Sequence, residues 1–320
     1  MHEKNFSFAL RRAFVLALCL PFFYGCSSAP KRPMLVSDTY TLAYSRLESA
    51  NSELLSGSLE KAEKSLRESY SLAYSVDNSD LLAKICLSGV SYKILAARLG
   101  KASASSLPAS AFLPSSSAGR KLSFLDGSAD EILGEAKAFS RRSSSSGYLL
   151  DLCSLYGVRA ELSLQEDLSE ERKNELLAVL SRIEKNVSKE AYYGGFLRRT
   201  RGDVYVSLSD FKSAERSYLE AAEIHAKSRY LYELALDWYS AARAFSLDGD
   251  KEKAVEAIEK ALKYDRDAEN TQALALDYLA YSKILLKGES SEAEKRKAWE
   301  LEIISGKIME NSNMLDSGEK

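Results

Sequence analysis

Residues 235–268 read ALDWYSAARAFSLDGDKEKAVEAIEKALKYDRDA, and this stretch decides the fold class. Small and bulky side chains recur in it three or four residues apart, as seen at Trp238, Ala242, Phe245, Ala254, Ile258 and Ala261. Such spacing places side chains on one face of an α-helix. Residues 247–250, with two Asp and one Gly, suit a turn. The stretch therefore predicts two antiparallel helices that approach closely through their small residues.

The same pattern occurs once more upstream, in residues 195–228. Its small and bulky members are Gly202, Tyr205, Ala214, Tyr218 and Ala221. Both segments resemble tetratricopeptide repeats (TPRs), helical hairpins in which small residues allow two helices to touch and larger ones fill the layer between pairs. The resemblance implies a stack of helical hairpins.

Weaker forms of the pattern cover most of the remaining chain. They lie at 38–74, 80–99 with 129–136, 148–165 with 169–187, and 271–286 with 291–311. No proline occurs from Ser115 to Lys320, which favours long helices. We therefore predict an all-α, TPR-like α-solenoid of five to six antiparallel helix pairs at residues 38–311, followed by a tail at 312–320.

A low-complexity insertion interrupts the second predicted pair at residues 101–119. Fifteen of its 19 residues are Ser, Ala, Gly or Pro, a composition that cannot supply a core. We expect a loop that lies on the solenoid. The alternative is a hook for a partner or a bilayer, formed by Leu107, Phe112 and Leu113.

The N-terminus has the composition of a secretory signal. Lys4, Arg11 and Arg12 precede an apolar stretch at 13–23, which is too short to span a bilayer that needs about 20 residues. Its ending, Phe-Tyr-Gly-Cys at 23–26, resembles a bacterial lipobox.

That resemblance implies a signal peptide at residues 1–25, acylation of Cys26, for example by palmitate, and a flexible tether at 26–37. We therefore predict a lipoprotein that is anchored in the cell envelope and faces the periplasm. Ordinary secretion and an uncleaved anchor are the alternatives.

Two further cysteines, Cys86 and Cys153, lie in apolar helical runs. An oxidising envelope would permit a disulfide between them. We favour the other interpretation, in which each thiol is a small core side chain.

Charge and motifs indicate a binding protein. The net charge is −2 for the whole chain, and −4 without residues 1–25, which carry three basic residues and one acidic residue; this does not suit nucleic acid. His225 is the only histidine beyond the signal, and its place late in a helix suits a solvated or cationic side chain. We expect no metal, no cofactor and no enzymatic activity, since neither metal-ligand clusters nor nucleotide-binding glycine motifs are present.

The resemblance to TPR proteins implies a groove lined by the first helix of each pair. Equivalent positions in successive repeats lie 40 residues apart along the chain. The candidate partner-binding residues at these positions are Arg199, Asp203, Tyr239, Arg243, Leu279 and Lys283. Arginine and tyrosine are common binding hot spots. The alternative for Arg199 and Asp203, four residues apart on one helix, is that they only pair with each other.

These features predict a scaffold that holds an envelope protein or peptide near the membrane. Some bacterial TPR lipoproteins work with the solute-binding subunit of TRAP transporters, so the alternative is a ligand-handling partner of such a transporter. A cavity between helices, lined by tyrosine and arginine, would favour this alternative.

Overall fold

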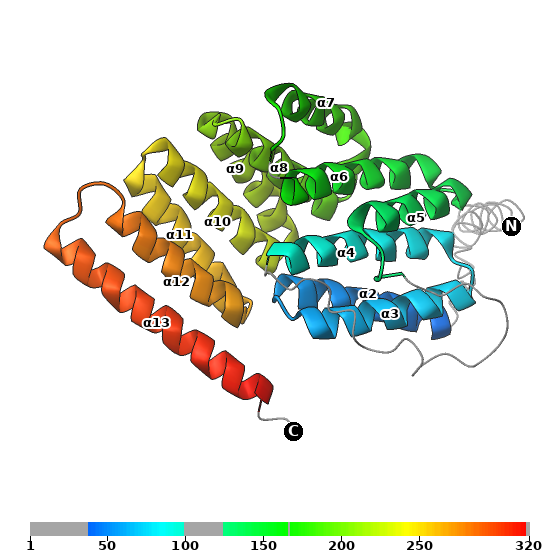
Figure 1. The fold of residues 1–320 in the computed structure, drawn as a ribbon, viewed down its shortest axis with the longest axis horizontal. Coiled ribbons are helices and arrows are strands. Elements are labelled where there is room, and N and C mark those ends of the chain that lie inside the picture. Colours follow the sequence, from blue (N-terminus) through cyan, green and yellow to red (C-terminus); the bar gives the residue numbers. More distant parts are fainter. Residues whose placement is uncertain (1–37, 99–123, 166, 318–320) are drawn as a thin grey trace, which may run out of the picture. The chain divides into compact units, whose positions relative to one another are not determined.

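The computed structural model describes residues 38–98, 124–165 and 167–317, and within them every regular element is a helix (Figure 1). The helices are α2 (Asp38–Leu55), α3 (Leu59–Ser75), α4 (Ser79–Arg98), α5 (Ala129–Arg142), α6 (Ser146–Leu164), α7 (Glu170–Val187), α8 (Ala191–Ser207), α9 (Phe211–Ser228), α10 (Leu231–Asp248), α11 (Lys251–Asp267), α12 (Thr271–Leu286) and α13 (Glu292–Ser317).

These helices form six consecutive pairs, from α2–α3, joined by the Arg46–Glu68 ion pair, to α12–α13, and this confirms the predicted all-α, TPR-like solenoid. The split second pair is also confirmed, because α4 packs against α5 although the predicted insertion at 101–119 separates them in sequence. The last helix runs to Ser317, past the predicted end at 311. The predicted signal, Cys26, the tether and the insertion lie outside the described residues.

Turns between paired helices repeat with the same chemistry 40 residues apart. Asp210 caps α9 by accepting a hydrogen bond from the backbone N–H of Ser213, and Asp250 caps α11 in the same way, each at 3.1 Å. The residue before each cap, Ser209 or Gly249, has a positive φ, which turns the chain back on itself. The turn sequences thus fix where each second helix starts.

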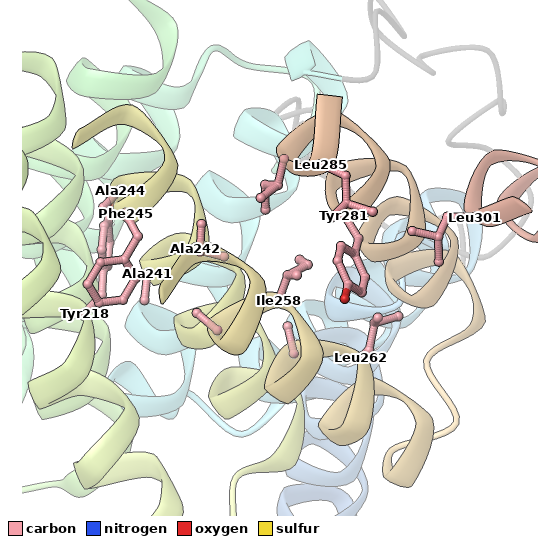
Figure 2. Close-up of a cluster of buried hydrophobic side chains, with 14 of the residues drawn as sticks. Tyr218, Ala241, Ala242, Ala244, Phe245, Ile258, Leu262, Tyr281, Leu285 and Leu301 are labelled. Atoms are coloured by element: carbon pink, nitrogen blue, oxygen red, sulfur yellow. The ribbon is translucent and has the colours of Figure 1, made fainter. Parts of the chain in front are cut away.

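The small residues of the repeat pattern lie at the helix contacts. Ala254 and Ala261 have no exposed surface and belong to a core formed by residues of α9, α10, α11, α12 and α13. Figure 2 labels other members of this core, such as Tyr218, Ile258 and Leu285. Gly202 on α8 lies against the ring of Tyr218 on α9, where an added Cβ would be 2.5 Å from a ring carbon. Only glycine lets these two helices pack at this separation.

Both described cysteines, Cys86 and Cys153, are free thiols buried in the helical core. The Cys153 Sγ lies 3.5 Å from the hydroxyl of Ser140. The interpretation of these residues as small core side chains is confirmed.

The first helices of successive pairs contact one another directly: α4 contacts α6, α6 contacts α8, and α8 contacts α10. In addition, the side chain of Gln272 at the start of α12 lies against Gly57 in the turn between α2 and α3. Residues far apart in the sequence are therefore brought together on the side of the solenoid that the first helices form.

Candidate binding site on the first helices

A cavity of about 140 Å³ lies where five first helices meet. α2, α4, α6, α8 and α10 all contribute to its wall, and the side chains that define its character are Leu54, Leu95, Tyr156, Arg159, Phe196 and Arg199. The wall is therefore largely apolar, with cationic groups at a few positions. This combination is typical of small-ligand sites, although the cavity is smaller than most of them.

The side chain of Arg199 on α8 is the centre of a buried charge network. Its guanidinium donates to Asp237 Oδ1 at 2.8 Å and pairs with the carboxylate of Glu233, both on α10. All three side chains are buried, and Arg199 is only 3% exposed. Although burial opposes ionisation of Arg199, the two carboxylates raise its pKa overall. The network ties α8 to α10 across the inner side of the solenoid.

His225 on α9 extends this network. Its Nδ1 lies 2.5 Å from Asp237 Oδ2, and its Nε2 lies 3.2 Å from the carbonyl oxygen of Tyr192. Both ring nitrogens of His225 therefore face oxygen atoms, one on α10 and one on α8. The sequence interpretation of His225 as a solvated side chain is wrong: the residue is 0% exposed.

A second polar cluster joins α6, α8 and α9. Arg159 forms an ion pair with Asp203, and the hydroxyl of Tyr218 donates to the other oxygen of Asp203 at 2.7 Å. The guanidiniums of Arg159 and Arg199 lie 5.9 and 5.5 Å from the ring centre of Phe196, within the range of cation–π attraction. Two arginines of the cavity wall thus lie beside the same aromatic ring.

The four remaining predicted groove residues lie on α10 and α12. Tyr239 and Leu279 are partly buried, whereas Arg243 and Lys283 are exposed. Neither Arg243 nor Lys283 has a carboxylate partner among the described residues. Exposed leucines accompany them on the same two helices: Leu236 at 37% and Leu276 at 49% exposure. We call the surface formed by Leu236, Tyr239, Arg243, Leu276, Leu279 and Lys283 the groove, after the predicted groove to which these residues were assigned.

The structure therefore divides the predicted site in two. Arg199 and Asp203 belong to buried or half-buried clusters, while the other four residues lie on α10 and α12 in the groove. The alternative in which Arg199 and Asp203 only pair with each other is wrong, because each pairs with a residue of a different helix.

Two buried carboxyl groups occupy the equivalent of the His225–Asp237 pair one repeat further on. Asp265 on α11 and Asp277 on α12 lie close enough to affect each other's ionisation, and Asn270 Nδ2 donates to Asp265 at 2.9 Å. The Oδ2 of Asp277 is buried and has no partner in the described part of the chain. Burial, and then the charge of Asp265, raise the pKa of Asp277, so this pair retains a proton.

Sequence reasoning missed the partners Glu233, Asp237 and His225. One signal was available for two of them, since Glu233 and Asp237 are the only charged residues in the apolar run 231–242. Buried acidic side chains in such a run need a cationic partner. The sequence alone does not say which arginine supplies it.

The described residues contain no group of three or more His, Cys, Asp or Glu side chains arranged to hold a metal ion. Within these same ranges, no helix has both the length and the apolar character required to cross a bilayer.

Comparisons with known proteins agree with this architecture. A family model described as a tetratricopeptide repeat matches residues 238–267. A search of curated proteins found no match.

Two solved structures are similar to this chain. One is a signal transduction ATPase with numerous domains (STAND) protein with a tetratricopeptide repeat sensor, from Pyrococcus horikoshii, with 16% identity and a TM-score of 0.50 over 82% of this chain and 36% of that one. The other is a Rap protein complexed with Competence and Sporulation Factor, with 14% identity and a TM-score of 0.39 over 86% of this chain and 90% of that one. This chain thus spans little more than a third of the STAND protein, and that likeness concerns the fold alone. The chain is an all-α, TPR-like solenoid that carries a tetratricopeptide repeat at residues 238–267.

Proposed function

We propose that this chain is a lipid-anchored envelope protein that binds another protein through the groove on α10 and α12. The observation that carries the proposal is the combination in the groove of exposed leucines with two cations, Arg243 and Lys283, that have no carboxylate partner within the described ranges. Exposed apolar side chains beside unpaired charges are typical of an interaction surface.

The charges of the groove indicate what kind of partner it binds. The chain as a whole is acidic, at −2, yet the exposed ionic side chains of the groove are both basic. A partner segment with carboxylates and apolar side chains matches both properties. Complementary charge of this kind accelerates association and selects among partners.

The groove can be tested by capture of envelope proteins. Arg243→Ala and Tyr239→Ala should each weaken capture of the partner by about 2 kcal/mol, or about 30-fold, because a central anchor is lost. The matched control is Arg216→Ala on α9, another exposed arginine without a carboxylate partner in the described residues. If both groove variants capture every protein that wild type captures, while Arg216→Ala loses one, the partner binds elsewhere.

The membrane anchor rests on the lipobox-like ending at residues 23–26 and the polar tether that follows it. A lipid on Cys26 would hold the solenoid close to the bilayer, and two or more acyl chains give stable anchoring where one is marginal. The role of the solenoid would then be to recruit its partner to the membrane surface.

Cys26→Ala should abolish incorporation of a palmitate analogue and release the protein from the membrane fraction, because no other cysteine lies at a lipobox-like ending. Cys86→Ala is the control, since its thiol is buried and it should label like wild type. Equal labelling and equal membrane partition of Cys26→Ala and wild type would contradict the anchor.

A second function, ligand handling beside a TRAP-type transporter, is favoured by one specific observation. The cavity on the first helices is lined by two tyrosines, Tyr156 and Tyr192, and by arginines. A protein that only held a partner in its groove would not require such a cavity. Association with a solute-binding protein, tested by co-purification, would support this second function.

A further inference from the structure

The lining of the cavity on the first helices contains three arginines and one carboxylate, Glu233. Arg98, Arg159 and Arg199 all contribute to its wall. Arg159 has a carboxylate partner in Asp203, and Arg199 has Glu233 and Asp237. Arg98, at the end of α4, is different: its guanidinium donates a hydrogen bond of 3.2 Å to the hydroxyl of Ser163, which carries no charge.

The pKa shifts of Arg159 and Arg98 have the direction expected where arginines lie close together. Burial, followed by repulsion from Arg98 and Arg199, lowers the pKa of Arg159. Burial, followed by repulsion from Arg243, lowers the pKa of Arg98. Arg243 of the groove therefore lies close enough to Arg98 to repel it, and neither has a carboxylate partner in the described part of the chain.

An unsatisfied donor lies in the wall of the same cavity. The Nε of Arg199 is buried and has no hydrogen-bond acceptor among the described residues, although the side chain is only 3% exposed. A buried donor without an acceptor destabilises the folded protein, because it has lost its hydrogen bonds to water. A ligand oxygen in the cavity is one way to remove that cost.

Apart from Glu233 and two small polar side chains, Asn51 and Ser91, the rest of the wall is aliphatic or aromatic. α2 and α4 contribute Leu54, Leu55, Ile94 and Leu95, and α8 contributes Phe196. A highly hydrated anion such as phosphate would lose its water against these side chains without compensation. An anionic group joined to an apolar body fits both parts of the wall.

We propose that this cavity binds a small apolar carboxylate, whose anionic group faces Arg98 and Arg159 and whose hydrocarbon fills the leucine-lined part. The volume of about 140 Å³ limits the buried part of the ligand to the size of one large aliphatic side chain. That chemistry could come from a free aliphatic acid or from the C-terminal residue of a polypeptide. This proposal rests on the ligand-handling function and specifies its ligand class.

Isothermal titration of the full-length protein, purified from cells, tests the proposal directly. The probes are hexanoate, hexylamine and a tetrapeptide ending in leucine, used either as the free acid or as the amide. We expect hexanoate or the free-acid peptide to bind. Tighter binding of hexanoate would identify the ligand as a free aliphatic acid, and tighter binding of the peptide would identify it as the C-terminal residue of a polypeptide. We expect hexylamine and the peptide amide to bind at least tenfold more weakly than their acidic counterparts.

Two variants show whether binding occurs in this cavity. Arg98→Gln should weaken binding of the acid at least tenfold, and because Arg98 is exposed and forms no ion pair in the described ranges, the fold should be retained. Arg216→Gln on α9 should bind like wild type. Absence of binding by every acidic probe, or equal binding by Arg98→Gln and wild type, would overturn the proposal. No partner protein is present in this titration, so its failure would leave the capture test of the groove unaffected.

Discussion

Arg199→Ala is expected to lower the free energy of unfolding by about 3–5 kcal/mol, the usual cost of removing one partner from a buried ion pair. The substitution would leave the carboxylates of Glu233 and Asp237 buried without their cation. The imidazole of His225 would remain 2.5 Å from Asp237 Oδ2 but would not replace the guanidinium between the two carboxylates. Urea unfolding followed by far-ultraviolet circular dichroism measures the difference.

Two further variants test whether the loss of stability is caused by the buried charges. Arg216→Ala removes an exposed arginine and should change stability by less than about 0.5 kcal/mol. Adding Glu233→Gln and Asp237→Asn to Arg199→Ala should recover part of the loss, because neutral amides cost less to bury than carboxylates. If Arg199→Ala is no less stable than Arg216→Ala, the buried network does not hold α8 to α10.

The second large effect concerns the proton shared by Asp265 and Asp277. Burial and the neighbouring carboxyl raise the folded-state pKa of Asp277 above its ordinary value of 3.8, so the folded chain keeps a proton that the unfolded chain has released. Raising the pH from about 4 towards alkaline values must therefore favour the unfolded state. Each unit of pKa difference is worth about 1.4 kcal/mol, and buried carboxyls commonly shift by about 2 units or more.

Asp277→Asn should remove this pH dependence, because an amide can donate to Asp265 at every pH. At pH 8 we expect the variant to be about 3 kcal/mol more stable than wild type, and the two should converge near pH 4. Asp267→Asn, at an exposed carboxylate two residues from Asp265, should follow the wild-type curve. Parallel curves for Asp277→Asn and wild type between pH 5 and 8 would show that the pair holds no proton.

The sequence was sufficient to predict the helices and their close contacts. Ala254 and Ala261 could be assigned to a helix–helix contact because short spacings on one helix determine which side chains share a face. Residues 247–250 could be assigned to a turn because Asp and Gly suit turn conformations. These are local properties of the chain.

The cavity and the buried network depend on contacts that no local pattern contains. Arg199 has the spacing of a groove residue, but its exposure is decided by Glu233 and Asp237, which lie 34 and 38 residues further along the chain. The wall of the cavity combines Leu54 of α2 with Leu236 of α10. That proximity follows from the rotation between successive helix pairs, which a single repeat does not specify.

The central claim is that the partner binds in the groove, and site-specific photo-crosslinking in intact cells tests it most directly. A photoreactive amino acid replaces Leu276, which lies in the groove and is 49% exposed, or Leu219 on the second helix α9, which is 38% exposed. We predict a crosslinked partner rich in acidic residues from position 276 and none from position 219. Crosslinking of an acidic partner from position 219, with no crosslink from position 276, would contradict binding in the groove.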